Sequence, residues 1–269
     1  MTSAPLLAVE GLSKRFGGVV ALDALDLAVH DGEAHAVIGP NGAGKTTLIA
    51  QLAGEVRPSA GRIRFAGRDI TDLPAHARVR IGIARSFQIT SLLASFSALE
   101  NVQVALRPRQ GHSFRPFRDA ARDQALNRRA AALLAQVGLA ERTATPAAEL
   151  AHGEQRQLEL AMALAAGPRL MLLDEPMAGV GHDEAQRMLE LLLRIRRECA
   201  LLLVEHDMDA VFRIADRITV LVGGRVLASG TPEAIRTDPR VREAYLGAAP
   251  EQAAGAAAAG KASAGKASE

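Results

Sequence analysis

The chain of 269 residues is poor in cysteine and in aromatic side chains. Cys199 is the only cysteine, which excludes a disulfide within the chain and a metal site built from cysteines. Tryptophan is absent, and all aromatic residues together make up 3% of the chain, whereas apolar residues make up 48%. The core must therefore consist mainly of aliphatic and small side chains. This composition is typical of an α/β protein with helices packed on a sheet.

Long apolar runs and a strong net charge are missing as well. No apolar run approaches the roughly 18 residues of a membrane span. The N-terminus lacks the basic flank and hydrophobic segment of a secretory signal. The formal net charge is +2, which by itself does not indicate a nucleic-acid partner. We therefore expect a cytosolic protein that could reach a membrane through a partner.

One glycine-rich stretch carries the strongest motif. It matches the P-loop pattern G-x-x-x-x-G-K-[ST] in full and reads Gly39-Pro40-Asn41-Gly42-Ala43-Gly44-Lys45-Thr46-Thr47. The apolar run 34–38 before it predicts a buried strand, and the apolar spacing of 46–52 after it predicts a helix that ends at Gly54. In that context the loop N–H groups bind phosphate, Lys45 reaches the β- and γ-phosphates, and the Thr46 hydroxyl ligates Mg²⁺. A glycine-rich turn without a ligand is the alternative.

Two further buried strands are predicted to end in polar residues. The run 170–173 leads into Asp174 and Glu175, and the run 200–204 leads into Glu205-His206-Asp207. Ligands of open α/β sheets bind at the carboxyl edge of the strands. An acid at that edge, Asp174, can hold Mg²⁺ opposite the P-loop threonine, and a second acid, Glu175, can polarise a water. His206 lies at the same edge and is a candidate functional residue rather than a structural histidine.

The rest of the chain indicates one domain over residues 1–247. Alternating residues in 6–38 predict half-buried strands, and residues 89–165 are mainly helical in pattern. An amphipathic helix is predicted over 182–197, and a hairpin over 218–229 with Gly223-Gly224 at its turn. Residues 248–269 consist largely of alanine, glycine, lysine and serine, which predicts a disordered tail. The basic segment 107–122 is either a partner-facing surface or a solvated loop.

In their order along the chain, these motifs resemble those of ATP-binding cassette (ABC) ATPases, over about residues 6–247. By this resemblance Phe16 takes the position of the aromatic that stacks on adenine. Gln88 matches the glutamine that senses Mg²⁺ and the attacking water and relays to a transmembrane partner. The stretch 150–154 takes the place of the signature, which usually reads L-S-G-G-Q. Glu175 matches the general base, and His206 matches the switch histidine that contacts the γ-phosphate.

The resemblance implies an α/β P-loop NTPase fold with an antiparallel β subdomain, a mainly parallel core sheet and a helical subdomain over about 89–165. It also implies that Mg·ATP is hydrolysed in a head-to-tail dimer. Each ATP then lies between the P-loop of one subunit and the signature residues Ala151, Gly153 and Glu154 of the other. Two departures stand out: Ala151 replaces the signature serine, and Gly181 replaces an aspartate that crosses the dimer in many members. Because of the second departure, it stays open whether the two ATP sites of the dimer communicate.

Among ABC ATPases, the chain is most similar to those of branched-chain amino acid importers and their urea or amide relatives. The stretches that carry this similarity are 14–18, 82–88, 150–153, 176–179, 204–208 and 244–247. Ala151 is itself characteristic of this group. The resemblance implies a second cassette, identical or different, two transmembrane permeases and a periplasmic binding protein, with this chain on the cytoplasmic face of the inner membrane. The ATPase of lipopolysaccharide export is the alternative transporter.

Two other classes of function compete with transport. The first class is that of soluble ABC ATPases that act on nucleic acid or in Fe–S assembly. Members that act on DNA usually carry long coiled coils, and members that act on ribosomes usually carry two cassettes in one chain. This sequence shows one cassette and no sustained heptads. A P-loop kinase or GTPase is the other, but it would not require the motif near 150 or His206. The guanine-reading motif N-K-x-D is also absent. We therefore expect a transport ATPase that binds no nucleic acid.

Overall fold

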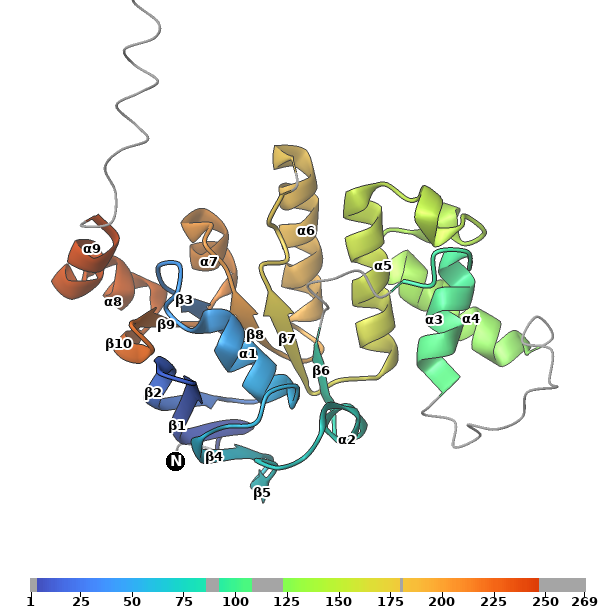
Figure 1. The fold of residues 1–269 in the computed structure, drawn as a ribbon. Helices are drawn as coiled ribbons and strands as arrows, with labels where there is room; N and C mark the ends of the chain where they lie inside the picture. The colour runs from blue at the N-terminus through green and yellow to red at the C-terminus, as the bar shows by residue number, and fades with distance from the viewer. Residues whose placement is uncertain (1–3, 86–91, 108–122, 180, 247–269) are drawn as a thin grey trace, which may run out of the picture.

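The computed structural model describes residues 4–85, 92–107, 123–179 and 181–246, and within them the strands form two sheets (Figure 1). The first sheet is antiparallel, with the order β2-β1-β4-β5, and contains β1 (Leu7–Phe16), β2 (Val19–Val29), β4 (Ala60–Phe65) and β5 (Arg68–Asp69). The β-rich start predicted for residues 6–38 is thereby confirmed.

The second sheet has the order β10-β9-β3-β8-β7-β6. Its strands are β3 (Ala34–Ile38), β6 (Ile83–Arg85), β7 (Leu170–Asp174), β8 (Ala200–Val204), β9 (Arg217–Val222) and β10 (Arg225–Gly230). All neighbours are parallel except β9 and β10, which form the predicted antiparallel hairpin. The sheet is therefore mainly parallel, as expected, and the loops that follow β3, β7 and β8 meet at one edge.

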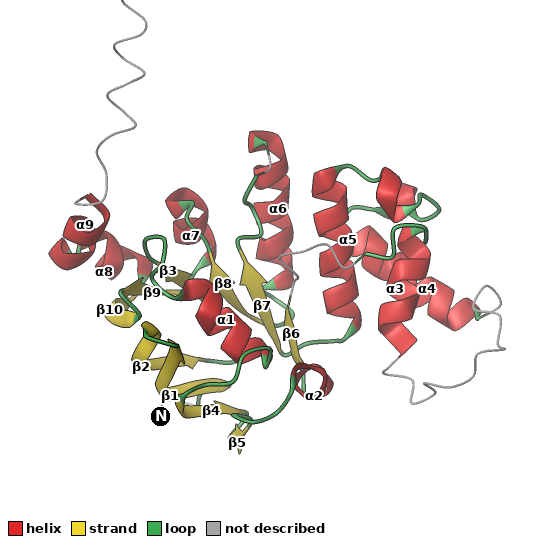
Figure 2. Cartoon of the chain, in the orientation of Figure 1, coloured by secondary structure: helices red, strands yellow, loops and turns green. Residues whose placement is uncertain are grey.

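The central strands β3, β7 and β8 are buried along their whole length. Their side chains alternate between two apolar clusters because successive residues of a strand point to opposite faces. In β8, Leu202 packs with helix α1 (Lys45–Ala53) and the antiparallel sheet, whereas Leu201 and Leu203 pack with α6 (His182–Ile195) and α7 (Met208–Ile214). The core sheet thus has helices on both faces (Figure 2).

A helical group stands beside the core sheet (Figure 1). It consists of α3 (Ala98–Leu106), α4 (Gln124–Gln136) and α5 (His152–Ala165), which pack against one another. The remaining α-helices of the described ranges are α2 (Ala75–Arg80), α8 (Pro232–Thr237) and α9 (Pro239–Leu246). The predicted helix 182–197 ends at Ile195, two residues early. Within these ranges, every helix is too short or too polar to span a bilayer. The tail 248–269 and the segment 108–122 lie outside these ranges.

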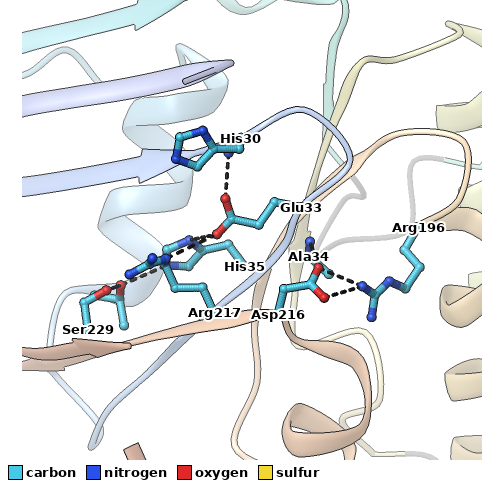
Figure 3. Close-up of polar contacts among 9 residues, drawn as sticks. His30, Glu33, Ala34, His35, Arg196, Asp216, Arg217 and Ser229 are labelled. Carbon is cyan, nitrogen blue, oxygen red and sulfur yellow. Dashed lines mark hydrogen bonds and ion pairs between the residues drawn. The ribbon is translucent and has the colours of Figure 1, made fainter. Parts of the chain in front are cut away.

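A polar network lies at the amino ends of β3 and β9, away from the P-loop (Figure 3). His35 is buried, and its Nδ1 lies 3.0 Å from Glu33 Oε1 while its Nε2 lies 2.8 Å from Thr219 Oγ1. Burial would raise the pKa of Glu33, but hydrogen bonds from His35 and from the His30 N–H bring it below its ordinary value. Because both ring nitrogens of His35 have hydrogen-bond partners, its burial leaves no ring nitrogen unsatisfied, and its role here is structural.

Arg78 of α2 is a buried cation that bonds only to backbone carbonyls. Its Nη1 donates to the carbonyls of Gln51 (2.7 Å) and Leu52 (2.8 Å), which belong to the last turn of α1. Its other two nitrogens donate to the carbonyls of Ile70, Thr71 and Leu73. Burial lowers the pKa of Arg78 to about 10, so the guanidinium stays charged at neutral pH. The positive charge also lies at the carboxyl end of α1, where it interacts favourably with the negative end of the helix dipole.

We predict that Arg78→Met lowers the free energy of unfolding by at least about 3 kcal/mol, because several buried carbonyls lose their donors. Urea denaturation followed by circular dichroism measures this. Arg80→Met is the matched control, since Arg80 is exposed on the same helix and should change stability by less than about 0.5 kcal/mol. An equal, small loss in both variants would contradict the role of Arg78.

Candidate functional site

The P-loop joins the carboxyl end of β3 to the amino end of α1. Gly44, the residue that precedes α1, has φ 100°, and a Cβ there would lie 2.4 Å from the carbonyl oxygen of Ala21. A Cβ at Gly39 would lie 2.2 Å from the carbonyl oxygen of Leu221. Both positions therefore require glycine. No side chain caps the amino end of α1, which leaves its first N–H groups available for an anion.

Lys45 is the first residue of α1, and its side chain is buried against this loop. Its Nζ donates to the carbonyls of Gly39 at 2.7 Å and Pro40 at 3.1 Å. Burial lowers the pKa of Lys45, and the charges of Glu175 and Asp174 act in the opposite direction. Asp174 ends β7 and Glu175 follows it, at the sheet edge where the P-loop follows β3. Thr46 is exposed and Thr47 half-buried at the start of α1. The structure thus brings together the P-loop and the two acids, as the sequence predicts.

Asp174 is the last residue of β7, and its side chain is 1% exposed. Its Oδ2 accepts a hydrogen bond from Arg85 Nη2 at 3.1 Å, whereas the buried Oδ1 has no partner among the described residues. Burial raises the pKa of Asp174, and Arg85 opposes this rise. A buried carboxylate oxygen without a partner is a suitable ligand for a hard cation such as Mg²⁺.

Glu175 adopts a left-handed backbone conformation with φ 50°, which is uncommon for a residue other than glycine. Its N–H donates to the carbonyl of Val204 in β8 at 2.9 Å. Arg156 of α5 donates from Nη1 to the carbonyls of Pro176 at 2.9 Å and Glu175 at 3.4 Å. These contacts hold the turn, and strain of this kind persists where the surrounding structure enforces it, often at functional sites.

His206 follows β8 at the same edge and is exposed, with its side chain 65% accessible. Its neighbour Glu205 is buried, and the two carboxylate oxygens accept hydrogen bonds from the N–H groups of Met177 (2.9 Å) and His206 (3.1 Å). Burial raises the pKa of Glu205, and these hydrogen bonds oppose it. Glu205 therefore ties together the loops that follow β7 and β8.

The signature residues lie at the amino end of α5, whose first N–H groups have no acceptor within the helix. The Glu154 carboxylate accepts from the Ala151 N–H and from Arg142 Nε, both at 3.0 Å. Gly153 lies against Glu184, since a Cβ there would be 3.1 Å from its carboxyl carbon. The amino end of α5 faces the same side as the carboxyl ends of the strands, but it is displaced laterally from α1 and the P-loop (Figure 1).

Two other residues predicted to belong to the site are Phe16 and Gln88. Phe16 ends β1 with half of its surface exposed, and Lys14 Nζ lies 4.9 Å from the ring centroid. The hairpin of β1 and β2 also packs on the P-loop through Ala21. Gln88 lies outside the described residues.

No sequence motif marks Arg85, Arg156 or Glu205 as part of this site. The only local signal was for Glu205, which directly follows an apolar strand and so begins the same polar edge.

Comparisons with known proteins agree with this geometry. Residues 22–178 match the family described as "ABC transporter", and residues 225–251 match "Branched-chain amino acid ATP-binding cassette transporter". The chain is 40% identical to the high-affinity branched-chain amino acid transport ATP-binding protein LivG of Salmonella typhimurium, over 92% of this chain and all of LivG. It is also 40% identical to BraF of Pseudomonas aeruginosa, a protein of the same description, with the same coverage.

A solved structure supports the fold. The ADP conformation of an ATP-binding cassette from an ABC transporter superposes with a TM-score of 0.79 at 28% identity, over 91% of this chain and 100% of the cassette. The predicted fold class, an antiparallel β part, a mainly parallel core sheet and a helical part, is thus confirmed. The chain belongs to the ABC transporter family, as one of its ATP-binding cassettes.

Proposed function

We propose that this chain is the ATP-hydrolysing motor subunit of a membrane importer for branched-chain amino acids. The observation that carries the proposal is that Lys45, Asp174 and Glu175 all lie on segments that leave one edge of a buried parallel sheet. The likeness to LivG and BraF, which spans their full length, supports the class of transported molecule.

The P-loop supplies most of the phosphate contacts in this proposal. The N–H groups of 39–47 and the amino end of α1 bind the phosphate oxygens. Lys45 exchanges the carbonyls of Gly39 and Pro40 for the β- and γ-phosphates, because a charged acceptor binds an ammonium group more strongly than a neutral carbonyl does. The exposed ring of Phe16 supplies a flat surface for adenine.

The hydrolytic residues follow the same edge. The Thr46 hydroxyl and Oδ1 of Asp174, which has no partner among the described residues, would hold Mg²⁺, with Gln88 as a further ligand. The bound ion would supply charge neutralisation for the phosphates. Glu175 accepts a proton from the attacking water as general base. His206, which is exposed in the single chain, contacts the γ-phosphate, and Gln88 orients the water.

The signature residues act on the nucleotide of a partner cassette. In one chain the amino end of α5, which bears Ala151, Gly153 and Glu154, lies apart from the P-loop on the same side of the molecule. A second cassette in head-to-tail orientation would therefore bring each set to the other's ATP. The free N–H groups at the start of α5 would then close the open side of the γ-phosphate. Because Glu154 already bonds to the Ala151 N–H, the donors come from the residues after Ala151.

The complete system then contains a second cassette, two transmembrane permeases and a periplasmic substrate-binding protein. This chain lies on the cytoplasmic face of the inner membrane through its contact with the permeases, and nucleic acid has no part in it. The relatives named above, described as ATP-binding proteins of branched-chain amino acid transport, support a place in a transport system.

We predict that Glu175→Gln retains ATP binding but lowers ATP turnover by at least about 100-fold, because an amide cannot accept the proton of the water. Binding of a fluorescent ATP analogue and release of phosphate measure the two effects. Glu190→Gln is the matched control, since Glu190 is exposed on α6 and should leave both unchanged. Turnover of the Glu175 variant at the control rate would exclude Glu175 as the base.

The transport role is tested by affinity purification of the Glu175→Gln variant from gently solubilised native membranes, with ATP and Mg²⁺ present. We expect two polytopic permeases and a second cassette among the proteins identified by mass spectrometry. The permeases of a urea or amide importer, or export-type membrane proteins, would redirect the assignment within transport. Recovery of soluble partners only would contradict a transport role.

A further inference from the structure

Arg85 connects two acids that lie far apart in the sequence. It ends β6, at the margin of the core sheet, and its side chain is 11% exposed. Nη2 donates to Asp174 Oδ2 at 3.1 Å, and Nη1 forms a close ion pair with the Glu55 carboxylate. Glu55 follows the end of the P-loop helix α1, and its side chain is 39% exposed. Glu55 therefore holds one nitrogen of the Arg85 guanidinium, while another nitrogen contacts Asp174.

The two oxygens of Asp174 are in different situations because of this contact. Oδ2 is held by Arg85, and Oδ1 is buried without a partner among the described residues. The terminal torsion of an aspartate is broad, so the backbone of β7 does not by itself decide where each oxygen lies. A hydrogen bond from a guanidinium, which is planar and always charged, fixes that torsion.

We propose that Arg85 is a positioning residue for the metal site: it holds Oδ2 of Asp174 so that Oδ1 alone is presented to Mg²⁺. The inference rests on the proposed function, in which Asp174 holds Mg²⁺ beside ATP. Partners of this kind orient carboxylate ligands, and their loss typically lowers metal affinity about 10- to 100-fold. Glu55 has a supporting part, since it anchors the guanidinium that orients Asp174.

The alternative is that Arg85 only stabilises the fold by neutralising a buried carboxylate. The two readings differ in what they predict for nucleotide binding. A loss of fold stability would weaken ATP binding with and without metal. A loss of positioning would weaken only the part of ATP binding that depends on Mg²⁺, because the P-loop contacts to phosphate do not involve Arg85.

The test uses the purified full-length chain and a fluorescent ATP analogue. Binding is titrated once in EDTA and once at increasing Mg²⁺, for the unaltered chain, Arg85→Met and Arg85→Lys. We expect Arg85→Met to raise the half-saturating Mg²⁺ concentration about 10-fold, with the affinity in EDTA unchanged. Arg85→Lys should recover part of the loss, because it keeps a cation but not the fork. Arg80→Met, which removes an exposed arginine of α2, is the matched control and should behave as the unaltered chain.

The outcomes separate the inference from the proposed function. If the unaltered chain binds ATP with Mg²⁺ dependence and Arg85→Met shows the same Mg²⁺ requirement, only the positioning role is overturned. A parallel loss of affinity in EDTA and in Mg²⁺ would likewise overturn it in favour of a purely structural role. If the unaltered chain shows no Mg²⁺ dependence at all, the metal site of the proposed function fails, and the inference fails with it.

Discussion

The parallel pairing of β3, β8 and β7 is the constraint on which the rest of the molecule depends. Every residue of these strands is buried, so their backbone N–H and C=O groups must pair with one another. Because the three strands are parallel, they run in the same direction, and the segments that follow them leave the core at the same edge of the sheet. The P-loop, the pair Asp174-Glu175 and the pair Glu205-His206 are brought together for this reason, although they are distant in the chain.

Charged groups inside the core and at this edge are held by backbone carbonyls, backbone N–H groups and arginine side chains. Arg78 binds the carbonyls at the end of α1, Arg156 those of the turn at Glu175, and Glu205 the N–H groups of the two neighbouring loops. Arginine suits this work because its planar fork satisfies several acceptors at once. The hydrolytic residues therefore stand on loops that are tied to the rigid sheet, and Arg156 extends this link to the helix that bears the signature residues.

Much of this arrangement could be predicted from the sequence, and the exceptions share a physical cause. The buried strand 34–38, the strand 200–204 and the hairpin around Gly223-Gly224 were predicted closely, because their patterns lie in consecutive residues. The end of α6 was misplaced by two residues, since the last turn of a helix is decided by its surroundings as well as by periodicity. The contact of Arg85 with Asp174 spans 89 residues, and no local pattern reports it.

The sequence by itself determined the P-loop with its strand and helix, the buried strands that end in acids and a histidine, and through them the family. These features depend on short-range spacing: glycines where the backbone needs them, and apolar residues at the period of a strand or helix. Only the tertiary structure decided the strand order and the displacement of the signature from its own P-loop. It also decided that Arg85 holds one oxygen of Asp174, whereas the other has no partner among the described residues. Those features depend on packing between segments that are distant in the sequence. The whole fold decides which hydrogen-bond partner lies within reach of each buried polar group.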